Sequence, residues 1–266
     1  MQPIVLNLNE ISGEVSRMWW PVLRIGGFVL TAPTTSEASI PRTVKVVLTV
    51  SLTFLVAPLT QVPAGLSIFS ADGMLAALLE VLIGISIGMV VQVAFEALTF
   101  AGQSISLSMG LGFATLVDPQ RGAQTPVLGQ LFVIFGTLTY LALNGHLMLI
   151  GTLVDSFKYM PIGNAHVDQD FLLMVIMWGA RVFDSGLLIA LPAVIALIIV
   201  NLALGVVTRA APQLNLFGIG FTITVLCGFF VLIVGLDGIM SGITTLINNA
   251  LIAVSDLIGS RVAGAH

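Results

Sequence analysis

The sequence contains few charged side chains. Asp, Glu, Lys and Arg make up only 8% of it, whereas a soluble domain carries roughly 25%. The mean hydropathy is +1.09, and the stretches 122–154, 185–208 and 210–236 contain none of the four charged residue types. Each stretch exceeds the roughly 18 to 20 apolar residues that cross a bilayer core. This composition excludes a water-soluble domain, and the length of the apolar runs predicts an all-α, polytopic helical membrane protein.

Cysteines, basic clusters and catalytic motifs are also scarce. The single cysteine, Cys227, excludes an intrachain disulfide framework. A net charge of −4 without a basic cluster argues against nucleic acid as a partner. The sequence has neither a P-loop nor an HExxH motif, and its histidines do not cluster. We therefore expect no enzyme activity, no metal site and no cofactor.

The apolar segments are interrupted by proline and glycine. Residues 74–101 are typical of one long helix, with Glu80 and Glu96 inside it. Pro126 suits the first turn of a next helix, which we expect to run to about Val154. Positive residues are scattered along the chain and show no clear positive-inside bias. The order of membrane crossings therefore stays open at this stage.

Glu80 and Glu96 are the charged residues of the long predicted helix. An ideal helix places them about 160° apart and about 24 Å apart along its axis, so they cannot form one carboxylate site. Ionisable groups within a membrane are candidates for function. Proton coupling is one interpretation, and polar contact at a subunit interface is the one that we favour.

Four further polar residues stand out in apolar surroundings. Asn144 and His146 form either a pH-sensitive site or, as we favour, a kink or end of a helix. Asn201 could donate a hydrogen bond to another helix, a contact worth about 0.6 kcal/mol on average in membranes. Arg209 suits a helix C-terminus and is either a contact for another subunit or a snorkelling anchor.

The most irregular stretch is GLGFATLVDPQRGAQTPVLGQLF, residues 110–132. Gly110 and Gly112 allow the backbone to turn and pack closely. Asp118 and Pro119 favour a turn that returns the chain to the next helix. On these residues alone, a plain turn between helices is the favoured interpretation.

Several stretches together carry a resemblance to the FliR family of flagellar export proteins. They are IPRTVKVVLTVSLTFLVAP, MGLGFATLVDPQ with TPVLGQLF, NGHLMLIGTLVDSFKYMPIG and LALGVVTRAAPQLNLFGIGF. The resemblance extends from about residue 19 to residue 255 and implies a core subunit of the flagellar type III protein-export gate. It further implies partnership with FliP and FliQ, contact with FlhB, and a place in the bacterial inner membrane at the flagellar basal body. Related virulence systems share this architecture, but the motifs favour the flagellar one.

The resemblance also assigns parts of the chain. It likens residues 1–170 to FliP and residues 171–266 to a FliQ-like helical hairpin. Under the resemblance, a contact made by Arg209 would be with a loop of FliQ or FlhB, and the snorkelling anchor stays the alternative. The resemblance further implies that one loop plugs the closed conduit against the passage of unfolded flagellar subunits. The plug residues are Gly110, Leu111, Gly112, Phe113, Ala114, Thr115, Leu116, Val117, Asp118 and Pro119. The apolar members suit this role, because a hydrophobic constriction can close a passage by dewetting.

Two other functions remain open at this stage. A secondary transporter of a small solute or ion would use Glu80 and Glu96, but it predicts paired broken helices in the two halves. The segment 110–126 has no visible counterpart in the second half. A scaffold subunit that lines no pore is the third alternative.

Overall fold

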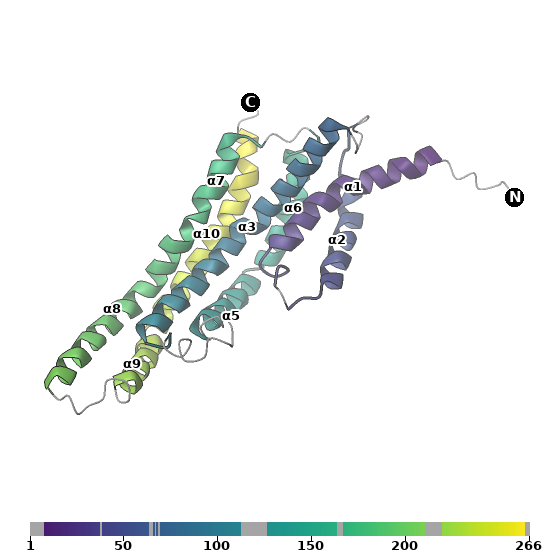
Figure 1. The fold of residues 1–266 in the computed structure, drawn as a ribbon. Helices are drawn as coiled ribbons and strands as arrows, with labels where there is room; N and C mark the ends of the chain where they lie inside the picture. The colour runs from purple at the N-terminus through teal and green to yellow at the C-terminus, as the bar shows by residue number, and fades with distance from the viewer. Residues whose placement is uncertain are drawn as a thin grey trace. The chain divides into compact units, whose positions relative to one another are not determined.

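The computed structural model describes residues 8–37, 39–63, 66, 68, 70–112, 127–163, 167–210 and 220–263. Over these residues the regular structure is helical, as the sequence predicts (Figure 1). The helices are α1 (Leu8–Thr31), α2 (Arg42–Val56), the 3₁₀ turn η1 (Ala57–Leu59), α3 (Ala71–Ser108), α5 (Val127–Ala142), α6 (Gly145–Tyr159), α7 (Gln169–Gly179), α8 (Arg181–Ala210), α9 (Phe221–Val234) and α10 (Leu236–Ala263).

Several of these helices have the length and composition of membrane spans. The segments long and apolar enough are Arg42–Leu59, Ala71–Ser108, Gln169–Arg209 and Leu236–Gly259. α5 and α6 are long and apolar enough to cross a membrane when the two helices are taken together. The predicted class, a polytopic helical membrane protein, is therefore confirmed.

The single helix predicted from Pro126 to about Val154 is wrong. α5 ends at Ala142 and α6 begins at Gly145, with a bend of 66° at the break. Asn144 has φ 55°, in the left-handed region that asparagine tolerates better than most residues and that no α-helix can include. Its carbonyl accepts hydrogen bonds from the N–H groups of Leu147 at 3.0 Å and Met148 at 3.1 Å, which starts α6. Asn144 therefore lies at a break between two helices, and His146 follows in the first turn of α6.

The chain forms two compact units, and α3, α7 and α10 supply residues to both. The first unit comprises residues 1–92, 144–177 and 250–266. Within it, α1 lies very close to the first half of α3. A Cβ on Gly84 of α3 would overlap the carbonyl oxygen of Arg24 on α1. This small residue therefore lets the two helices approach, as is common between membrane helices.

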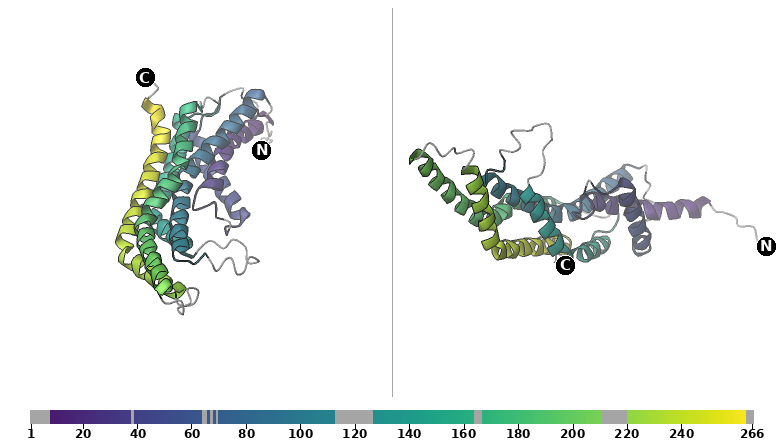
Figure 2. Two further views of the ribbon diagram at one scale, coloured as in Figure 1. Left: turned by 60° about the vertical axis from the view of Figure 1, so that its left-hand side comes forward. Right: turned by 90° about the horizontal axis from the view of Figure 1, so that it is seen from below.

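The second unit comprises residues 93–143 and 178–249. Within it, α8 packs against α9 (Figure 2). α5 lies against the second half of α3, where a Cβ on Gly102 would come within 2.6 Å of the backbone of Gly129. The second unit therefore brings the C-terminal half of α3 together with the α8–α9 hairpin.

Candidate functional site

The predicted plug starts where α3 ends. Gly110 has φ 81°, and its N–H donates to the carbonyl of Leu107 at 3.0 Å. The N–H of Leu111 donates to the carbonyl of Ser106 at 3.0 Å. These two bonds with a left-handed glycine form a Schellman motif, a common end for a helix. Of the plug residues, Gly110, Leu111 and Gly112 are thus described, and Phe113 to Pro119 lie outside the described residues.

Asn201 joins the end of α3 to α8 and α9. Its Nδ2 donates to the backbone carbonyl of Ser108, the last residue of α3, at 3.0 Å. That carbonyl is one of those at a helix end that have no partner within the helix. The Oδ1 of Asn201 accepts from Oγ1 of Thr224 on α9 at 3.2 Å. Asn201 therefore makes the cross-helix hydrogen bonds expected from the sequence.

Met109 provides a second, apolar contact at the same place. Its side chain is fully buried, and it lies against Gly228 of α9. A Cβ built on Gly228 would come within 2.5 Å of the Met109 side chain. The two residues that precede Gly110 are thus held by one polar and one apolar contact with the α8–α9 hairpin.

The first unit contains a buried ion pair between α1 and α3. Nε of Arg24 donates to Oε2 of Glu80 at 2.7 Å, and a terminal nitrogen, Nη2, donates to Oε1 at 2.9 Å. Both side chains are buried, with exposed fractions of 0% and 1%. Such a two-point contact between guanidinium and carboxylate is among the strongest hydrogen-bonded pairs in proteins.

The remaining donors of Arg24 are directed at α6 and the residue that follows it. Nη1 donates to Oγ of Ser156 at 3.0 Å, and Nη2 also donates to the carbonyl of Met160 at 2.7 Å. The guanidinium carbon lies 4.2 Å from the centre of the Phe157 ring. A buried ion pair is favourable only when such further bonds satisfy its polar atoms. The site therefore ties α1, α3 and α6 together, and Arg24, a charge in a short apolar run, was its sequence signal.

The other polar candidates lie apart from these two sites. Glu96 is exposed on α3, and His146 is half-buried near the start of α6. Arg209 is exposed in the last turn of α8, the helix position that the sequence predicts. Asn144 is exposed at the break between α5 and α6. The structure thus assigns Glu80 to a buried pair within the chain, and the subunit-interface interpretation stays a prediction for Glu96 and Arg209.

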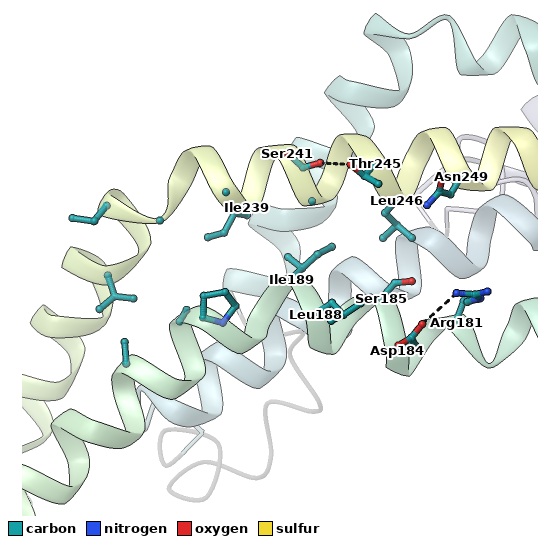
Figure 3. A pocket seen from close by; sticks show the side chains of 18 of the residues that line it. Arg181, Asp184, Ser185, Leu188, Ile189, Ile239, Ser241, Thr245, Leu246 and Asn249 are labelled. Atoms are coloured by element: carbon teal, nitrogen blue, oxygen red, sulfur yellow. Dashed lines mark hydrogen bonds and ion pairs between the residues drawn. The ribbon is translucent and has the colours of Figure 1, made fainter.

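A cavity of about 670 Å³ lies among α8, the end of α9 and α10 (Figure 3). Leu188 and Ile189 of α8 and Ile239 of α10 line it, together with small residues of α10 such as Gly242. The charged side chains at its edge, Arg181 and Asp184, pair with each other at 3.3 Å and are more than half exposed. The lining is therefore a mainly apolar surface formed by residues of three helices.

Comparison with known proteins identifies the family. The family described as bacterial export proteins, family 1, matches residues 15–250. The flagellar biosynthetic protein FliR of Escherichia coli (strain K12) is 42% identical over 211 residues, which cover 79% of this chain and 80% of that protein. FliR of Aquifex aeolicus is 32% identical over 214 residues, covering 80% and 82%. FliR of Bacillus subtilis is 31% identical over 219 residues, covering 80% and 83%.

The family match spans all the stretches that carry the resemblance, and it also covers α3 and the α8–α9 hairpin. The matches also agree with the apolar helices long enough to cross a membrane. The family consists of export proteins and not of enzymes. The chain therefore belongs to the FliR family and is an integral membrane protein of the flagellar export apparatus.

Proposed function

We propose that this protein is a core subunit of the flagellar type III export gate in the bacterial inner membrane, at the flagellar basal body. With FliP and FliQ it forms the conduit for unfolded flagellar subunits, and it contacts FlhB. Residues 110–119 plug this conduit in its closed state. Family membership over residues 15–250 supports the role in export.

The observation that carries the plug is the end of α3. Gly110 terminates a long apolar helix with a Schellman motif, so the chain leaves the helix at the residue where the proposed plug begins. The following sequence supplies Phe113, Leu116 and Val117, which are apolar enough to exclude water from a narrow passage.

We further propose that residues 1–170 correspond to FliP and residues 171–266 to a FliQ-like hairpin. The packing of α8 on α9 supports a hairpin in the second part. The two compact units divide the chain at other points, because they reflect packing within this chain and the proposed division concerns likeness to two other proteins.

The buried pair of Arg24 and Glu80 argues against the transporter alternative. Both carboxylate oxygens of Glu80 accept from Arg24, so this group is already engaged by a cation of the same chain. Glu80 therefore supports a structural role, and no other feature of the described residues favours solute transport over protein export.

Ion leak across the inner membrane tests the plug. The chain is co-expressed with FliP and FliQ in three forms: unchanged, lacking residues 111–117, and with these residues replaced by a Gly-Ser linker of equal length. We expect both altered complexes to assemble and to pass small ions or a dye, because the apolar seal is gone. Assembled complexes that stay tight in both forms would contradict the plug.

A further inference from the structure

The end of α3 is held more firmly than a simple turn requires. The Schellman motif satisfies the carbonyls of Ser106 and Leu107 but leaves the carbonyl of Ser108 without a helical partner. Asn201 of α8 donates to it. In an apolar environment an unsatisfied carbonyl is costly, so this long-range hydrogen bond completes the end of the helix.

The chemistry of the three groups sets the orientation of the Asn201 amide. The carbonyl of Ser108 can only accept, so the amide nitrogen must face it. The hydroxyl of Thr224 lies 3.2 Å from the amide oxygen and 3.0 Å from the carbonyl oxygen of Gly220, and its single proton can serve either acceptor. An aspartate or an apolar residue at position 201 cannot serve both contacts at once, whereas the asparagine amide does.

The apolar contact of Met109 strengthens the same attachment. The absence of a side chain on Gly228 makes room for Met109 on α9. The residue that follows Met109 is Gly110, where the proposed plug begins. Ser108 and Met109 are therefore fixed to the hairpin immediately before the chain turns away.

We propose that Asn201 is a positioning residue of the closed conduit. Together with Gly228, it holds the end of α3 on the α8–α9 hairpin and so determines where the 110–119 segment starts. A displacement of α9 along α8 moves the Thr224 hydroxyl away from the amide of Asn201, and this weakens the hold of Asn201 on Ser108. Closure of the conduit is thereby coupled to the packing of the hairpin. This inference rests on the proposed plug function.

The test uses the complete complex with FliP and FliQ and measures assembly and ion leak together. Asn201→Leu removes both hydrogen bonds at similar volume. Thr224→Val leaves the bond to Ser108 and removes the contact with the amide oxygen, together with the bond from the same hydroxyl to the carbonyl of Gly220. Asn248→Leu, at an exposed asparagine of α10, is the matched control. Deletion of residues 111–117 is the reference for an open conduit.

We expect Asn201→Leu to raise the ion leak severalfold over the unchanged complex, toward the level of the deletion, while the complex assembles. Thr224→Val should leak less, because the bond to Ser108 remains. Asn248→Leu should stay tight. In the deletion background Asn201→Leu should add no further leak, since the segment that it positions is absent.

The apolar contact provides an independent variant. Gly228→Ala forces Met109 to shift, and we expect complexes with this variant to leak ions. The double variant Gly228→Ala with Met109→Ala should be tight again, because the shorter side chain makes room for the new methyl group. This rescue distinguishes positioning from general loss of stability.

The outcomes separate the two proposals. If the deletion leaks and both Asn201→Leu and Gly228→Ala stay tight, Asn201 does not position the plug, although the plug itself stands. If the deletion stays tight, the plug function is wrong. The inference is overturned if Asn201→Leu increases the leak of the deletion complex as much as it increases the leak of the unchanged complex. It is also overturned if Asn201→Leu leaks only in complexes that fail to assemble. In either case the role of Asn201 is general packing.

Discussion

Arg24 and Glu80 form a two-point ion pair in the interior of the first unit, although 56 positions separate them in the sequence. Ser156 accepts from Arg24 through Oγ, and the same hydroxyl donates to the carbonyl of Leu153 at 2.6 Å. The pair thus stands in a network whose polar atoms have partners on three helices. The hydrogen bonds of Arg24 therefore hold α1, α3 and α6 together.

The first prediction concerns Glu80→Gln. This change keeps the shape of the side chain but leaves the buried guanidinium without its counter-charge, and we expect a loss of about 3 to 5 kcal/mol. Thermal unfolding of the purified complex measures it. Glu96→Gln, at an exposed position of the same helix, should change the stability little.

The double variant Arg24→Met with Glu80→Leu extends this test. Replacing both charges by apolar groups should recover a large part of the stability, though not all, because the carbonyl of Met160 loses its donor. If the double variant is as unstable as Glu80→Gln, the two residues stabilise the fold by more than neutralising each other's buried charge.

A second prediction concerns the close approach of α1 and α3. Gly84→Ala places a methyl group on the carbonyl oxygen of Arg24, and because backbone atoms cannot move aside cheaply, we expect a loss of at least about 2 kcal/mol. Gly151→Ala on α6 meets nothing within 4 Å. It should be neutral or stabilising by up to about 1 kcal/mol, since alanine favours helix more than glycine does. Equal effects of the two changes on thermal unfolding would contradict the proposed packing.

The end of α3 gives a third prediction. Gly110→Ala puts a Cβ on a residue at φ 81° and should cost about 1 to 2 kcal/mol. Gly110→Asn should cost clearly less, because asparagine tolerates the left-handed region. Chemical or thermal unfolding of the complex compares the two, and an alanine variant as stable as the asparagine variant would argue against the Schellman motif.

The break between α5 and α6 gives a fourth. Asn144→Gly keeps φ 55° accessible and should leave the stability nearly unchanged, whereas Asn144→Ala should lower it by about 1 kcal/mol. Spin-label distances between positions 131 and 152 measure the bend. We expect the glycine variant to keep these distances. If the alanine variant keeps both the distances and the full stability, tertiary packing alone determines the bend between α5 and α6.

Several properties followed from the sequence because each belongs to a single segment. The scarcity of charge and the long apolar runs determined a helical membrane protein, since the transfer of a segment into lipid depends on its own composition. The position of Arg209 in the last turn of α8 followed from the local signals for helix ends. The interruption near Asn144 was visible for the same reason, although the sequence did not show that it separates two helices.

The partners of the polar residues were decided only by the tertiary structure. Glu80 was predicted as a candidate for an interface between subunits, and its partner is Arg24 of the same chain because α1 packs on α3 through Gly84. The acceptor of Asn201 is a backbone carbonyl, which every residue type carries and which no pattern of side chains can mark. Composition and periodicity determine what each helix is, whereas the hydrogen-bond partners of a buried group depend on which faces of distant helices meet.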